Sequence, residues 1–67
     1  MDKKRKIIQL YQDVITVPEV ITRLYTEYQK LGYEMGKKIM FAFWYYRKEN
    51  IKMLVYWEEG YIYEEMV

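Results

Sequence analysis

The sequence predicts a small α+β domain of order β-α-β-β-β, in which one helix packs on an antiparallel sheet. Three observations lead to this fold class. A 3.6-residue apolar stripe occupies the first half of the chain, aromatic and branched segments fill the second half, and short polar turns separate those segments. The 67 residues suffice for a single domain (1–67), and a hydrophobic fraction of 52% argues against disorder.

The best-defined element is a helix over residues 17–31. Thr16 and Glu19 have the spacing of a capping box, and Pro18 falls in the first turn, where its missing N–H costs nothing. Gly32 follows the last apolar position and suits the residue after a helix end. Apolar residues recur at helical spacing on one face: Val17, Val20, Ile21, Leu24, Tyr25, Tyr28 and Leu31.

Three strands are predicted after the helix. Residues 37–46 and 51–57 are rich in aromatic and branched side chains, and residues 61–66 alternate in the same way. The polar residues 47–50 suit a hairpin loop, and residues 58–60 suit a second turn. Together these segments predict an antiparallel meander.

Residues 6–14 fit two structures. Strand alternation aligns Ile8, Leu10 and Val14, whereas helical spacing aligns a different apolar set equally well. We favour the strand, which gives the β-α-β-β-β order. The helical alternative gives α-α-β-β-β.

The predicted sheet has two apolar faces, and one helix can cover only one of them. Along residues 39–46, one face takes Ile39, Phe41, Phe43 and Tyr45, and the other takes Met40, Ala42, Trp44 and Tyr46. An uncovered aromatic face indicates an interaction surface. The residues that we expect to form the partner contact are Trp44, Tyr46, Leu54 and Tyr56.

This pattern has two interpretations, in which the second face is covered either by a partner or by the chain itself. We expect a second copy of the chain, which gives a homodimer, or a host protein. In the alternative, the N-terminal segment and long Tyr, Lys and Arg side chains cover the face within one chain.

Charge is nearly balanced over the whole chain but not along it. Lys and Arg number 11, Asp and Glu number 10, and the formal net charge is +1. Residues 1–6 form a basic arm that is free to be flexible, whereas residues 57–67 are acidic. These opposite signs could guide head-to-tail contact between chains or simply be solvated.

The missing residue types exclude most enzyme chemistry. The sequence holds no His, Cys or Ser, so Ser-His and Cys-His nucleophiles and histidine acid–base catalysis are impossible. We expect no catalytic residue, no cofactor and no small-molecule substrate.

Two carboxylate pairs are the only candidates for a metal site. They are Glu58 with Glu59 and Glu64 with Glu65, whose oxygens suit magnesium. Adjacent strand residues point to opposite faces, so we expect no metal there and a solvated acidic edge instead.

A nucleic-acid-binding regulator is the alternative function. Aromatic side chains beside cations can stack nucleobases while the cations hold phosphates. The basic residues that would contribute lie in the arm and in the hairpin loop: Lys3, Lys4, Arg5, Lys6, Arg47 and Lys48.

The leading expectation is a small non-catalytic interaction or regulatory protein that binds and blocks a macromolecular partner. Short accessory proteins of this kind are common in viruses and mobile elements. The sequence shows no export signal and no apolar stretch long enough for a membrane helix. We therefore expect a cytoplasmic protein without a membrane partner.

Overall fold

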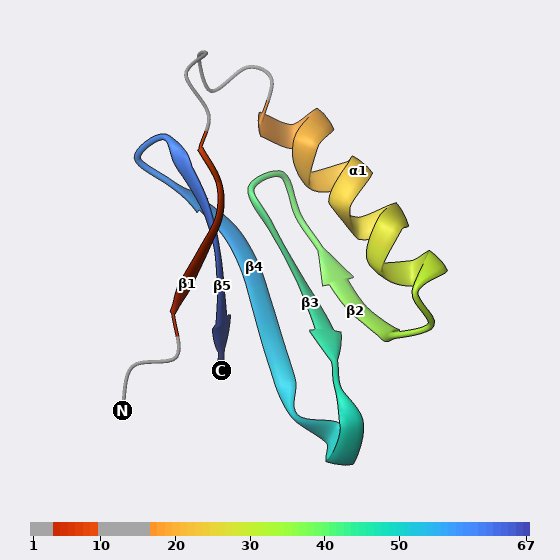
Figure 1. Cartoon of the computed structure of the whole chain (residues 1–67). Coiled ribbons are helices and arrows are strands. Elements are labelled where there is room, and N and C mark those ends of the chain that lie inside the picture. The colour runs from red at the N-terminus through yellow and green to blue at the C-terminus, as the bar shows by residue number, and fades with distance from the viewer. Residues whose placement is uncertain (1–3, 10–16) are drawn as a thin grey trace.

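One helix packs against a five-stranded antiparallel sheet, which confirms the predicted α+β class (Figure 1). The computed structural model describes residues 4–9 and 17–67. In chain order the elements are β1 (Arg5–Gln9), α1 (Val17–Lys30), β2 (Glu34–Lys38), β3 (Ala42–Tyr46), β4 (Lys52–Glu58) and β5 (Tyr61–Met66). Among the described residues, a strand and then a helix come first, as predicted. Four strands follow the helix, one more than the three that the sequence predicts.

The strand order in the sheet is β1-β5-β4-β3-β2. Strands β2 to β5 form a meander, and β1 adds to it antiparallel to β5. Figure 1 shows α1 lying along β2 and β3, with β1 beside β5 at the opposite edge of the sheet. The first and last strands are therefore neighbours.

The end of α1 follows the prediction closely. Gly32 has φ of +97°, a left-handed conformation that glycine adopts without strain. The Gly32 N–H donates to the Gln29 carbonyl at 3.0 Å and the Tyr33 N–H donates to the Tyr28 carbonyl at 3.4 Å, which is the Schellman pattern. The predicted cap at Thr16 lies outside the described residues.

Leu31 does not belong to the buried stripe, although helical spacing places it there. It follows the last helical residue, Lys30, and its exposed fraction is 71%. The chain has already turned away from the sheet at that point.

The prediction of one strand over residues 37–46 is wrong. This stretch contains the end of β2, a turn at residues 39–41 and the whole of β3. The Ile39 N–H donates to the Ala42 carbonyl at 2.8 Å and closes the turn. The face assignment therefore fails for residues 39–41 but holds from Ala42 onward.

The strand prediction for residues 6–14 is confirmed over residues 6–9 of β1, whereas residues 10–14 lie outside the described residues. Arg5 and Lys6 belong to β1, so this part of the expected arm is a paired strand. Residues 1–3 lie outside the described part of the chain.

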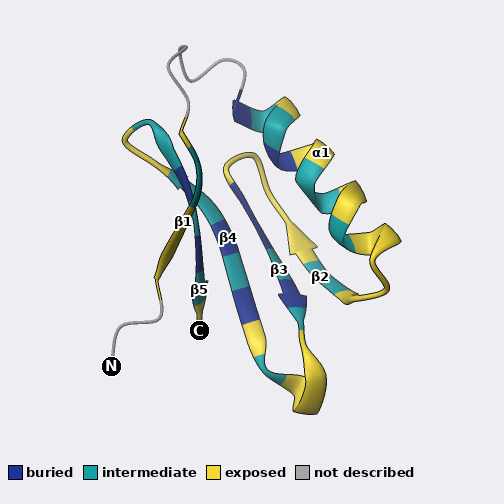
Figure 2. Ribbon diagram, viewed as in Figure 1, coloured by how far each residue is buried: buried dark blue, intermediate teal, exposed yellow. Residues whose placement is uncertain are grey.

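The core lies between α1 and one face of the sheet. Its fully buried side chains are Phe43, Ile21, Ile62, Val17 and Val55. Figure 2 shows buried positions on α1 and on the three central strands. The candidate site lies on the faces of β3 and β4 that point away from α1.

Candidate functional site

The face of the sheet that α1 does not cover, called here the helix-free face, carries the four predicted contact residues. Phe43, Tyr45 and Val55 pack with the helix, so their neighbours along β3 and β4 point to the opposite side. Trp44 pairs with Leu54 across the strands, and Ala42 pairs with Tyr56. The predicted residues on this face are all half-buried: Trp44, Tyr46, Leu54 and Tyr56.

Lysine ammonium groups lie over several rings of the helix-free face. Lys4 lies 4.1 Å from the centroid of Tyr63, Lys6 lies 4.4 Å from Tyr61, and Lys52 lies 5.7 Å from Trp44. Cations at this distance are attracted to the ring quadrupole. The chain's own lysine side chains therefore cover part of the helix-free face.

The β1 side of the helix-free face is polar. Lys4 pairs with Glu58 at 2.9 Å, and this hydrogen bond raises the pKa of Lys4. Burial raises the pKa of Tyr56, whose hydroxyl donates to Glu65 at 3.3 Å. The Tyr56 ring also packs beside the Tyr63 ring, with 5.7 Å between the ring centroids.

The β3 side of the helix-free face is more open. A depression of about 350 Å³ lies there, lined by Lys37, Trp44, Tyr46 and Lys52. Gly36 of β2 allows the close approach of Trp44, because a Cβ on Gly36 would lie 3.1 Å from the Trp44 Cβ. A base or an apolar side chain can enter this depression and contact the indole.

A second cluster lies on the helix side of the sheet, around the buried carboxylate of Glu64. Tyr45 donates its hydroxyl to Glu64 Oε2, and the Tyr28 hydroxyl donates to the same oxygen at 3.4 Å. Arg5 donates to Oε1 at 2.5 Å. Side chains from β1, α1 and β3 therefore meet at the carboxylate of Glu64 on β5.

The tyrosines of this cluster are held in their neutral form. Burial raises the pKa of Tyr28 to about 12, with Glu64 adding to the effect. Burial and the hydrogen bond to Glu64 raise the pKa of Tyr45. The hydrogen bond to Glu64 raises the pKa of Arg5, so the guanidinium stays charged.

Two further depressions lie beside the Glu64 cluster and the end of α1. The first, about 370 Å³, is lined by Arg5, Tyr28, Leu31, Tyr33, Tyr45, Arg47 and Glu64. The second, about 390 Å³, is lined by Leu31, Gly32, Tyr33, Glu34, Tyr46, Arg47 and Lys48. They share the lining residues Leu31, Tyr33 and Arg47 and so adjoin each other at the end of α1.

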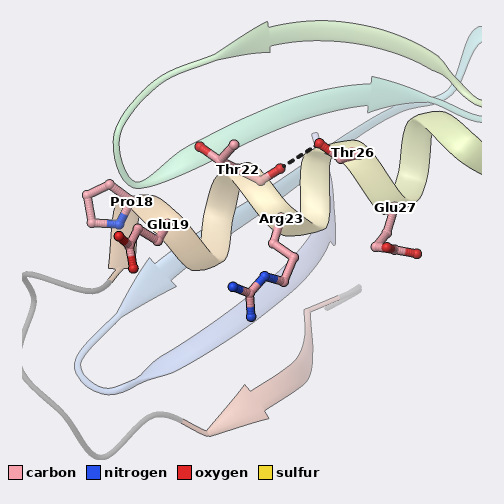
Figure 3. A pocket seen from close by; sticks show the side chains of 6 residues that line it. All are labelled: Pro18, Glu19, Thr22, Arg23, Thr26 and Glu27. Carbon is pink, nitrogen blue, oxygen red and sulfur yellow. Dashed lines mark hydrogen bonds between the residues drawn. The ribbon is translucent and has the colours of Figure 1, made fainter.

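Another depression, of about 600 Å³, lacks the features of a chemical site. Its described lining comes from α1 alone: Pro18, Glu19, Thr22, Arg23, Thr26 and Glu27. Figure 3 shows these side chains spread along the helix, with Thr26 donating to the Thr22 carbonyl at 3.1 Å. No set of polar groups converges on one point, as binding sites require.

The predicted nucleic-acid residues do not form one basic arm. Lys3 lies outside the described residues. Lys4 and Lys6 reach rings of the helix-free face, whereas Arg5 points to Glu64 on the other side. Arg47 and Lys48 belong to the β3–β4 loop and line the hollow at the end of α1.

Sequence reasoning missed Glu64 as an inward residue. It was expected on a solvated acidic edge, yet only 7% of it is exposed, and β5 lies between β1 and β4 rather than at an edge. The signal was present in the alternation of β5, because Glu64 shares a face with the buried Ile62. The opposite charges at the two ends of the sequence meet within one chain.

No group of three or more His, Cys, Asp or Glu side chains is placed to hold a metal ion within residues 4–9 and 17–67. Among the same residues, no helix has the length and apolar character needed to cross a bilayer. Comparison with protein-family models, curated proteins and solved structures finds no match to this chain.

Proposed function

We propose that this chain is a small non-catalytic binding protein that contacts a macromolecular partner through its helix-free face. One observation carries the proposal. Trp44, Tyr46, Leu54 and Tyr56 lie together on the sheet face opposite α1, and each keeps part of its surface exposed. Aromatic residues in such positions supply most of the binding energy at protein interfaces.

A second copy of the chain is the first partner to test. Two equal sheet faces related by a twofold axis bring the same apolar rows together, which is the commonest arrangement in protein oligomers. The β3 side, with its depression beside Trp44, is the part that a partner side chain would fill. Blocking of a further protein would then be steric, with the dimer occupying that protein's surface.

The mass in solution tests this proposal. We expect a dimer whose mass is the same at low and high salt, because apolar contacts change little with ionic strength. Trp44→Ala should raise the dimer dissociation constant by roughly tenfold or more. Leu54→Lys places a charge at the cross-strand neighbour of Trp44 and should have the same effect.

Gln29→Ala, an exposed change on α1, is the matched control and should leave the mass unchanged. Circular dichroism of each variant separates loss of association from loss of folding. A wild-type monomer at every concentration and salt would reject self-association. A dimer that both variants leave intact would reject this face as its interface.

Nucleic acid binding is the second candidate, and the lysines over the rings favour it. Lys4, Lys6 and Lys52 bring ammonium groups to aromatic rings, the two kinds of group that hold phosphates and stack bases. Each ammonium group lies over its ring and would have to move from the ring face to a phosphate when a base stacks there. Binding of this kind should fall steeply with salt, because it releases counterions. Salt dependence therefore distinguishes the two candidates.

A further inference from the structure

Three depressions of similar size follow one another around the end of the sheet. They are the hollow beside Glu64, the hollow at the α1–β2 turn and the depression beside Trp44, of about 370, 390 and 350 Å³. The first two share Tyr33 and Arg47, and the last two share Tyr46. The path begins on the helix side, passes the turn between α1 and β2, and ends on the helix-free face.

Cations outnumber carboxylates along this path. The cationic side chains in its lining are Arg5, Arg47, Lys48, Lys37 and Lys52. The carboxylates are Glu34 and Glu64, but Arg5 and Glu64 pair with each other. The cations that remain against Glu34 are Arg47, Lys48, Lys37 and Lys52. The path as a whole therefore attracts an anionic chain, although the protein is nearly neutral.

An accessible or half-buried aromatic ring stands at each junction of the path. Tyr33, with 36% of its surface exposed, lies between the first two depressions, and Tyr46 lies between the second and the third. The Tyr33 ring is braced at 4.8 Å by Tyr45 and at 5.9 Å by Tyr28. A ring fixed in this way loses little freedom when a base stacks on it.

We propose that these three depressions form a binding path for single-stranded nucleic acid. Unpaired bases would stack on Tyr33, Tyr46 and Trp44, while phosphates contact the bordering cations. A duplex keeps its bases stacked on each other and cannot offer them to rings in separate hollows. The proposal rests on the second candidate function, nucleic acid binding, because the third depression lies on the helix-free face.

Fluorescence anisotropy with a labelled oligothymidylate of about ten nucleotides tests the path, with a blunt duplex of equal length as comparison. We expect the single strand to bind at low salt and the duplex to bind more weakly. Tyr33→Ala should weaken binding roughly 5- to 100-fold, and Tyr33→Phe should retain it, because the ring is what stacks.

Arg47→Gln should weaken binding and lower the salt slope by about one. The matched control is Arg23→Gln, which removes the same charge from an exposed position of α1 that lines none of the three depressions. If Tyr33→Ala fails to fold, Arg47→Gln still tests the binding path, because Arg47 is exposed and its replacement leaves the core intact.

Three results would overturn the path: no binding of the single strand at low salt, equal binding of the duplex, or equal effects of Arg47→Gln and Arg23→Gln. These results leave the proposed function testable on its own. A salt-independent dimer that Trp44→Ala dissociates would uphold the helix-free face as an interface while removing nucleic acid as its partner.

Discussion

Glu64 links four elements of the fold through one side chain. Its oxygens accept hydrogen bonds from Arg5 on β1, Tyr28 on α1 and Tyr45 on β3, while its own strand is β5. A buried carboxylate is stable only when such partners replace the water it loses. Among the described residues, every buried side-chain nitrogen and oxygen has a hydrogen-bond partner.

Removing the carboxylate should therefore cost more than removing an ordinary surface charge. We expect Glu64→Ala to lower the free energy of unfolding by about 2–4 kcal/mol, because the Tyr45 hydroxyl loses its acceptor. Glu64→Gln keeps one acceptor oxygen and should cost about 1 kcal/mol. Urea denaturation measures both changes.

The matched control is Glu65→Gln, on the same strand but facing the other side of the sheet. Its cost should stay below about 1 kcal/mol. If Glu64→Ala and Glu65→Gln cost the same, the network around Glu64 contributes nothing to stability.

At the scale of the elements, the β4–β5 turn carries a local cost. Its two central residues, Glu59 and Gly60, have φ of 49° and 91°. A two-residue hairpin loop with both φ values positive is a type I′ turn, in which Asn-Gly is strongly preferred. Glutamate lacks the short polar side chain that makes this conformation tolerable for Asn.

Glu59→Asn should therefore raise the free energy of unfolding by about 0.5–1 kcal/mol. Gly60→Ala should lower it by about 1 kcal/mol or more, since alanine is strained at positive φ. Thermal and urea denaturation of the two variants measure both signs. A loss of stability in Glu59→Asn would contradict the type I′ assignment.

The elements that were predicted from sequence are those whose local signals agree with their packing. Helix α1 has both its apolar stripe and Gly32, β4 lies between two recognisable polar turns, and β5 follows the second of these turns. The turn at residues 39–41 was missed because it consists of Ile39, Met40 and Phe41, with none of the Gly, Pro, Asn or Asp that mark turns. Its side chains are exposed, a position that an apolar pattern cannot predict.

The candidate site was predicted in part for the same reason. Strand alternation suffices to place Trp44, Tyr46, Leu54 and Tyr56 on one face. The hollow beside Glu64 brings together Arg5, Tyr33 and Arg47, which are distant in sequence and belong to different elements. No local period relates such residues, so only the three-dimensional arrangement shows them.

At the scale of the whole molecule, the tyrosines around Glu64 make stability depend on alkaline pH. Tyr28 has a pKa of about 12 against an ordinary value of 10.0, so the folded chain holds this proton more tightly than the unfolded chain. The stabilisation is complete below about pH 10 and is lost as pH rises toward about 12.

We expect the free energy of unfolding to fall across this pH window, by about 1–2 kcal/mol for Tyr28 after allowance for its partial exposure. The raised pKa of Tyr45 adds to the loss in the same direction. Tyr28→Phe removes one ionisable group and should flatten part of the decline, which urea denaturation at several alkaline pH values measures. An unchanged slope in Tyr28→Phe would assign the decline to other groups.

The pairing of β1 with β5 also sets an order of assembly. Arg5 and Glu64 are 59 residues apart in sequence, whereas β2 to β5 pair with their immediate successors. Closing the longest loop is slowest, so the meander and α1 can form while β1 still lacks a partner. During that interval Ile7 and Ile8 belong to an unpaired strand, which is prone to aggregate. The charges of Lys4, Arg5 and Lys6 directly precede these two residues and oppose association with other chains until β5 pairs with β1.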